Sequence, residues 1–383
     1  MNKSMILNAN IKSGENEFSK LPGLLKEHGF KTPCILVDKN LYDNSSYVTK
    51  VINNIVPKKR LVFYDHPFEP SYQMLDNMMD ELNRKDILNN IDVWLGIGGG
   101  STMDTAKGLA ILTNNPGPSI NYKGFPVNIN EPLPIISVPS TTGTGSEVVY
   151  NASFIDEESK IKMGINYINN YPVLAILDPL IPSSAPLKVL SSSGCDALVH
   201  TLESFMSKET NNQVRLFSRQ AYKLIMSNMV PLLKGEGDLH NWLCMQWAAV
   251  YAMFALSNST SGPAGALSYF LGTHYRVNHG VAGAVFIGKV CQYNHENGFY
   301  DLQELYDGPD NNFMNNQEKS AKVIYEIEKL LTLAGIPGNL GGFGVKETDC
   351  DGFNKFAKQA KSAFDFNPVK IDLSQVANHF VKI

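Results

Sequence analysis

The sequence predicts an α/β N-terminal domain with a Rossmann-like parallel sheet, residues 1–182, followed by an all-helical C-terminal domain, residues 183–383. In the first part, short apolar runs alternate with helical patterns, which is typical of a parallel sheet built from βαβ units. One of these runs leads directly into three consecutive glycines. After Pro186, long segments with helical periodicity dominate and strand-like runs are nearly absent, which indicates a change of architecture.

The predicted strands of the first domain are short apolar runs bounded by turn residues, and interior strands of a parallel sheet are apolar on both faces, as these are. They cover residues 33–37, 61–64, 93–97 and 134–138, and residues 174–179 close the region. A helix is expected over residues 72–82, and a hairpin-like excursion over 148–155 and 162–165.

The second domain is predicted to be helical because its apolar residues recur at helical spacing. The helical segments are residues 194–207, 214–233, 241–257, 266–275 and 321–334. Residues 179–186 contain three prolines and paired serines, so this segment is the expected linker between the domains.

The composition excludes several classes of protein. The chain has 383 residues and a formal net charge of -4, and Lys58-Lys59-Arg60 is its densest basic cluster, so nucleic acid is not an expected partner. No apolar run is long enough to cross a membrane, and the polar start of the chain does not resemble a signal peptide. Five scattered cysteines without a C-x-x-C pair indicate reduced thiols in a cytoplasmic protein.

The glycine turn after residues 93–97 is the most informative local feature. Gly98, Gly99 and Gly100 lead into a polar segment with Ser101 and Asp104 that opens a helix. A helix N-terminus presents unpaired N–H groups and the positive end of the helix dipole, and glycine lets a pyrophosphate approach the backbone closely. The turn is therefore a candidate phosphate-binding site, although a tight turn that binds nothing would have the same residues.

Asp38 ends the first strong strand. A carboxylate at this place can accept hydrogen bonds from an adenosine ribose, and it favours NAD over NADP because a 2′-phosphate would meet a like charge. Taken alone, the residue is equally well explained as a helix N-cap or turn aspartate.

A second polar turn follows the strand at residues 134–138. It contains Thr141, Thr142, Thr144 and Ser146, with glycines between them. Hydroxyl groups at the carboxyl end of a strand can hold phosphate and ribose oxygens, although a long turn without a ligand is the simpler explanation for this segment alone.

Asp196 and His200 are four residues apart, so they share one face of a predicted helix. A carboxylate and an imidazole at this spacing can chelate one divalent metal, and they can equally form an ion pair. His279, just before Gly280 where a loop could meet a helix, is the candidate third ligand. His274 lies five residues earlier and is a candidate for the same cleft, where it could relay a proton.

With these residues assembled, the chain resembles the iron-containing, group III alcohol dehydrogenases, whose fold is that of dehydroquinate synthase. The resemblance covers nearly the whole chain and rests on four motifs: Asp38, the G-G-G-S-x-x-D segment, the T-T-x-G-T-G-S-E turn with serine at its first position, and the D-A-x-x-H helix with its H-G step. It implies NAD(H), a divalent metal (Fe²⁺ or Zn²⁺) held by Asp196, His200 and His279, and a homodimer. Lys162 resembles a lysine that contacts the nicotinamide ribose in relatives.

One position departs from the family pattern. The family normally supplies an aspartate and three histidines as metal ligands, and the position of one histidine is Gly265 here, so three ligands remain. The segment from Ser257 to Tyr269 also resembles the branch that acts on phosphonoacetaldehyde or oxidises 3-deoxy-octulosonates. This points to a small polar, anionic or sugar-derived substrate.

The resemblance implies hydride transfer between an alcohol or aldehyde and the nicotinamide, with the metal polarising the substrate oxygen. Asp196, His200, His279 and His274 would be the catalytic residues. Two alternatives remain open from the sequence: a dehydroquinate-synthase-like cyclase that uses the same cofactors, and a catalytically impaired cofactor-binding scaffold, which Gly265 makes credible.

Overall fold

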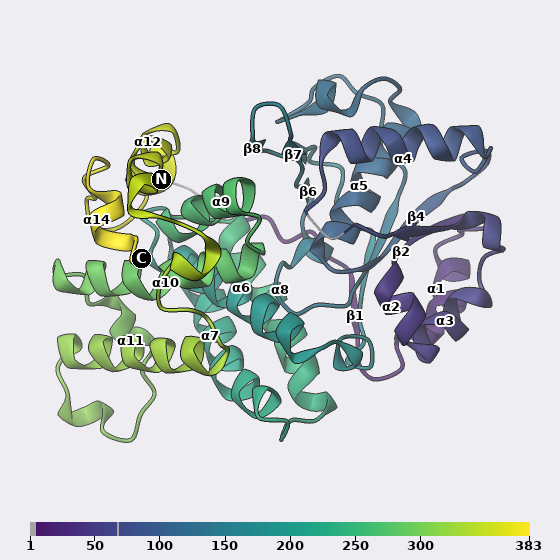
Figure 1. Ribbon diagram of the computed structural model, residues 1–383. Helices are drawn as coiled ribbons and strands as arrows, with labels where there is room; N and C mark the ends of the chain where they lie inside the picture. The colour runs from purple at the N-terminus through teal and green to yellow at the C-terminus, as the bar shows by residue number, and fades with distance from the viewer. Residues whose placement is uncertain (1–4, 67–68) are drawn as a thin grey trace. The chain divides into compact units, whose positions relative to one another are not determined.

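The computed structural model describes residues 5–66 and 69–383. They form two compact units, Leu7–Pro186 and Leu187–Ile383, and the boundary falls at the end of the expected linker segment 179–186 (Figure 1). Ile6 belongs with the second unit. Its backbone N–H and carbonyl both hydrogen-bond the side chain of Asn258, at 2.8 and 3.0 Å. Within the described residues, no helix has the length and apolar character needed to cross a membrane.

A six-stranded parallel sheet in the order β1-β10-β5-β4-β2-β3 forms the centre of the first unit. Its strands are β1 (Ile11–Ser13), β2 (Pro33–Asp38), β3 (Leu61–Tyr64), β4 (Val93–Gly98), β5 (Ile135–Pro139) and β10 (Leu174–Leu177). The four strands predicted at residues 33–37, 61–64, 93–97 and 134–138 are therefore confirmed within one residue at each end, and β10 lies in the segment 174–179 that was expected to close the domain. The edge strand β1 was not predicted.

Helices cover both faces of this sheet (Figure 1). They are α1 (Leu21–Glu27), α2 (Lys39–Asn44), α3 (Ser46–Asn53), α4 (Tyr72–Arg84) and α5 (Gly100–Asn114). Because successive side chains of a strand point to opposite faces, Leu95 of β4 packs in one core with α1 and α3, while its neighbour Trp94 packs in another with α4 and α5. This double burial explains why the strands are continuous apolar runs.

The strand order creates a topological switch point between β2 and β4. The chain runs from β2 outward to β3 and then returns to place β4 on the other side of β2, so the direction of winding reverses there. Val37 pairs with Ile97, so the carboxyl ends of the two strands, with Asp38 and Gly98, lie side by side. Open α/β sheets bind ligands at such a switch point.

The predicted hairpin-like excursion is confirmed as two nested antiparallel pairs. In the outer pair, β6 (Asn151–Ala152) lies against β9 (Ile165–Asn166). In the inner pair, β7 (Ile155–Asp156) lies against β8 (Ile161–Lys162).

The second unit is helical, and the structure describes no strand in it. Its helices are α6 (Leu187–Met206), α7 (Asn212–Leu233), α8 (Leu239–Ser257), α9 (Pro263–Tyr275), α10 (His279–Glu296), α11 (Asn316–Leu333), α12 (Cys350–Gln359), α13 (Lys361–Asp365) and α14 (Val376–Phe380). The five predicted helical segments correspond to α6, α7, α8, α9 and α11. Helix α6 contacts α7, α8, α9 and α10, so it forms the centre of this unit.

Candidate metal centre and cofactor-binding turns

Asp196 and His200 lie one turn apart on the buried side of α6. Asp196 is 4% exposed, and Nε2 of His200 lies 3.6 Å from its Oδ1 atom. This distance exceeds that of a hydrogen bond, so the two side chains face each other without being directly bonded.

His279 reaches the same carboxylate from α10. Asn278 caps this helix by accepting a hydrogen bond from the N–H of Gly280 at 3.1 Å. A Cβ atom at Gly280 would lie 2.1 Å from the carbonyl oxygen of Ser192, so only glycine lets the start of α10 approach α6 this closely. The approach places Nε2 of His279 3.8 Å from Oδ1 of Asp196.

The three side chains fit a divalent metal. One ligand atom from each of Asp196, His200 and His279 lies within 4.8 Å of the others, and no other such group of three occurs among the described residues. Ligand atoms around one ion with bonds of ~2.0 Å lie roughly 3 Å apart, so small shifts of these side chains would close the site. A carboxylate with two imidazoles suits zinc or ferrous iron.

The glycine turn joins β4 to α5 as predicted. Gly99 is the N-cap of α5, and within residues 5–66 and 69–383 no side chain caps this helix, so the N–H groups of its first turn are available to a ligand. A Cβ atom added to Gly98 would lie 2.6 Å from Thr102 Oγ1, and one added to Gly100 would lie 2.6 Å from Thr144 Cγ2. Side chains at these two positions are therefore excluded by sterics, which keeps the backbone open.

Asp38 acts as the N-cap of α2, because its Oδ1 atom accepts a hydrogen bond from Leu41 N at 2.8 Å. Burial raises the pKa of this carboxyl above its ordinary value, although hydrogen bonds from the backbone oppose the effect. The hydrogen bond from Leu41 N uses Oδ1, so a role of Asp38 as a helix cap does not by itself exclude a contact with a ribose.

Asp104 and Ser146 are joined by a hydrogen bond between the two predicted turns. Ser146 Oγ donates to Asp104 Oδ1 at 2.5 Å, and the other oxygen of Asp104 accepts from Ser153 N at 2.9 Å. The fully buried Lys107 completes the network, with Nζ 2.6 Å from Ser146 Oγ and 2.8 Å from the carbonyl oxygen of Asn151. Asp104 and Ser146 thus fix the second turn to α5 rather than facing solvent.

The other residues predicted to bind the cofactor make different contacts within the protein. Ser101 hydrogen-bonds the hydroxyl of Tyr64. Thr142 is buried, and the methyl group of Thr141 lies 3.3 Å from the place of a Cβ at Gly99. Lys162 forms a salt bridge of 2.7 Å with Glu69.

Comparison with known proteins decides the family. Residues 8–179 match the family described as iron-containing alcohol dehydrogenase, and residues 190–382 match the C-terminal domain of the same family. The chain belongs to the iron-containing alcohol dehydrogenases. It is therefore an oxidoreductase of the alcohol dehydrogenase type, with a dehydroquinate synthase-like fold.

Individual relatives of this alcohol dehydrogenase span most of its length. A 1,3-propanediol dehydrogenase of Klebsiella pneumoniae is 32% identical over 76% of this chain and 75% of its own. An NAD-dependent methanol dehydrogenase of Bacillus methanolicus is 29% identical over 72% and 71%. The crystal structure of a 1,3-propanediol oxidoreductase aligns with a TM-score of 0.87 and 27% identity, covering 99% of both chains.

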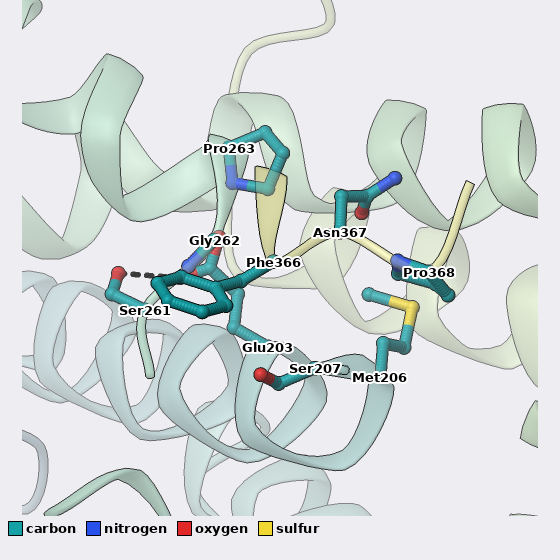
Figure 2. Close-up of a pocket in the computed structure, with 9 residues that line it drawn as sticks. All are labelled: Glu203, Met206, Ser207, Ser261, Gly262, Pro263, Phe366, Asn367 and Pro368. Carbon is teal, nitrogen blue, oxygen red and sulfur yellow. Dashed lines mark hydrogen bonds between the residues drawn. The ribbon is translucent and has the colours of Figure 1, made fainter. Parts of the chain in front are cut away.

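The structure explains what occupies the place of the fourth family ligand. A Cβ atom at Gly265 would lie 2.1 Å from Ser261 Oγ and 2.8 Å from Glu203 Oε2. The Glu203 carboxylate is buried and accepts hydrogen bonds from Ser261 Oγ, Gly262 N and Gly265 N at 2.8, 2.8 and 3.0 Å, so it caps the start of α9. Figure 2 shows this carboxylate beside Ser261 and Gly262, in the wall of a small pocket that Phe366 also lines.

His274 is not part of the metal group. It lies exposed in the last turn of α9, where its ring stacks on Phe270 with centroids 4.2 Å apart and its Nδ1 lies 3.1 Å from the carbonyl oxygen of Phe270. These contacts hold the ring along its own helix.

Sequence analysis gave no individual role to four charged residues that the structure buries: Lys107, Glu147, Asp178 and Glu203. Burial lowers the pKa of Lys107 below its ordinary value. Burial raises the pKa of Glu147 to about 7. Lys107 follows Asp104 by one helical turn, which is the spacing of an ion pair. Such pairs are usually exposed to solvent, so the spacing did not indicate that Lys107 is buried.

Proposed function

We propose that this protein is a metal-dependent, NAD(H)-linked alcohol dehydrogenase or aldehyde reductase that acts on a small polar alcohol or aldehyde. The observation that carries the metal dependence is the convergence of two histidine Nε2 atoms on one oxygen of Asp196, at 3.6 and 3.8 Å. The open glycine turn at the switch point of the sheet supports a dinucleotide. The NAD dependence of the Bacillus methanolicus relative supports NAD(H) in particular.

Asp196, His200 and His279 would hold the metal. A divalent ion bound there supplies a Lewis acid that polarises the oxygen of an alcohol or carbonyl substrate. The carboxylate of Asp196, which is 4% exposed, provides negative charge for the ion. Three protein ligands leave one coordination position for a substrate oxygen. Catalytic metal sites usually have such an open position, whereas structural sites do not.

The residues of the other unit would hold the dinucleotide, which supplies or accepts the hydride. The N–H groups at the start of α5 would bind its pyrophosphate. The second oxygen of Asp38 would accept hydrogen bonds from the adenosine ribose and disfavour the 2′-phosphate of NADP(H). Lys107 holds Ser146 and the carbonyl of Asn151, which fixes the second turn beside α5.

The metal requirement can be tested with His200→Ala. Metal content of the purified protein would be measured by mass spectrometry, and NADH consumption would be followed with a panel of small aldehydes. We expect wild-type protein to contain up to one divalent ion per chain and to oxidise NADH, and the variant to lose both. His240→Ala is the matched control, because His240 is exposed on α8 and lies outside the metal group.

Two outcomes would contradict the proposal. Full activity of His200→Ala or of metal-free protein would exclude a metal-dependent mechanism. Metal binding without net NADH consumption by any aldehyde would instead favour a cyclase, in which NAD is regenerated within each turnover.

A further inference from the structure

We infer that Ser268 is a positioning residue that fixes the tautomer of His279, so that the lone pair of Nε2 is directed toward Asp196. The inference rests on the proposed metal function, because this lone pair is what a metal would bind. Ser268 would thus prepare one of the three ligands before any ion binds.

Two distances fix the direction of the hydrogen bonds at Ser268. Its Oγ atom lies 2.6 Å from the carbonyl oxygen of Gly265 and 3.1 Å from Nδ1 of His279. A serine hydroxyl has one hydrogen, and two oxygens 2.6 Å apart without a hydrogen between them would repel each other, so the hydroxyl donates to the carbonyl. Toward His279 the same oxygen can only accept. Nδ1 must therefore carry the proton, and in the neutral ring Nε2 is then unprotonated.

The surroundings keep this arrangement in place. Ser268 is 1% exposed, so water does not replace its hydroxyl. The adjacent Tyr269 lies nearly parallel to the imidazole, with centroids 5.3 Å apart and an interplanar angle of 13°. The hydroxyl sets which nitrogen is protonated, and the aromatic ring restricts the tilt of the imidazole.

The other histidine of the group lacks an equivalent contact. Nδ1 of His200 is buried and has no hydrogen-bond partner among the residues that the structure describes. Metal-binding histidines usually donate their second N–H to a neighbouring oxygen, and loss of such partners typically lowers metal affinity by about 10–100-fold. Ser268 therefore matters more for orienting these ligands than it would in a site where a hydrogen bond also fixed the ring of His200.

The first test needs no metal. Protein labelled with ¹⁵N-histidine, at a pH where the imidazoles are neutral, would give ring nitrogen shifts that report the tautomer, with His279 assigned by comparison with His279→Gln. In the wild-type protein we expect His279 to carry its proton on Nδ1. In Ser268→Ala we expect a mixture with the Nε2–H form.

The second test measures zinc affinity by competition with a chromophoric chelator. We expect Ser268→Ala to bind zinc about 10–100-fold more weakly. Ser268→Thr, which keeps the hydroxyl, should recover most of that loss. Ser320→Ala is the matched control, because Ser320 is a buried serine 3.0 Å from Nδ1 of His295, outside the metal group. It should leave zinc affinity unchanged.

An Nε2–H form of His279 in the wild-type protein would overturn the inference, and this measurement does not depend on whether any variant folds. Unchanged zinc affinity in folded Ser268→Ala would also overturn it. If wild-type protein bound no metal but carried the Nδ1 proton as expected, the proposed function would fail while the role of Ser268 in setting the tautomer would stand.

Discussion

Replacing Gly265 with alanine should destabilise the helical unit, although it is a small change in a helix. The added Cβ atom would lie 2.1 Å from Ser261 Oγ, so that hydroxyl must leave its hydrogen bond to Glu203. A hydrogen bond to a charged group contributes about 1.5–3 kcal/mol, and alanine offsets up to ~1 kcal/mol through its higher helix propensity. The carboxylate must also move, because its Oε2 would be 2.8 Å from the new atom. We expect a net loss of about 2 kcal/mol in the free energy of unfolding.

Gly288→Ala is the matched control for this experiment. Gly288 is also in a helix of the same unit, α10, but there the new atom would meet Leu331 Cδ1 at 3.6 Å, which is ordinary contact. This variant should gain about 0.5–1 kcal/mol. Urea denaturation followed by tryptophan fluorescence is a suitable assay, because Trp242 and Trp247 both lie in α8 of this unit.

The same contact decides the outcome of restoring the family histidine. If the backbone tolerated a side chain, Gly265→His would be expected from the sequence to tighten metal binding. The structure places Ser261 and Glu203 where that side chain would begin, so we expect a less stable protein without a gain in metal affinity. Unchanged stability of Gly265→Ala, or tighter metal binding by a fully folded Gly265→His, would refute this reasoning.

Three further predictions concern the α/β unit. Asp38→Gly should bind NADPH, which a fluorescence titration would measure. Because glycine is nearly as good a helix N-cap, the substitution should lower the free energy of unfolding by only a few tenths of a kcal/mol. An unchanged preference for NADH over NADPH would mean that Asp38 does not contact the ribose. Gly99→Val should abolish NADH binding in a folded protein, whereas Gly23→Val, whose Cβ would meet nothing within 4 Å, should bind normally. Because the pKa of Glu147 is raised to about 7, the folded state binds more protons than the unfolded state between pH 4.5 and 7, and the free energy of unfolding falls as pH rises through this window. As pH rises from 4.5 to 7, the free energy of unfolding of Glu147→Gln should therefore increase relative to that of the wild type, by at most roughly 3 kcal/mol in total. If the two proteins lost stability in parallel over this range, the assignment to Glu147 would be wrong.

Much of the architecture could be predicted because it depends on local pattern. Residues 93–97 are apolar on both faces, and the glycines after them mark the end of β4 and the start of α5. The edge strand β1 could not be predicted in this way. It has three residues, and only its pairing with β10 makes it a strand.

Side-chain contacts between distant segments were beyond sequence analysis. Gly265 showed that a histidine was missing, but not that Glu203, 62 residues earlier, accepts a hydrogen bond from its N–H. Lys107 is an exception to the rule that lysines are exposed, and its acceptors belong to the second turn and to β6. The spacing of Asp196 and His200 was informative because both residues are on one helix.

The pairing of β1 with β10 also bears on the order in which the α/β unit can fold. Residues at opposite ends of this unit meet at Asp178, whose Oδ2 atom accepts hydrogen bonds from Phe18 N and the Tyr47 hydroxyl, at 3.0 and 2.6 Å. The Phe18 contact spans 160 residues of sequence. On a ribosome, the central strands can assemble as they emerge, but β1 has no partner until Leu174–Leu177 has been synthesised. The start of the chain is thus expected to be the last part of the sheet to become protected during synthesis.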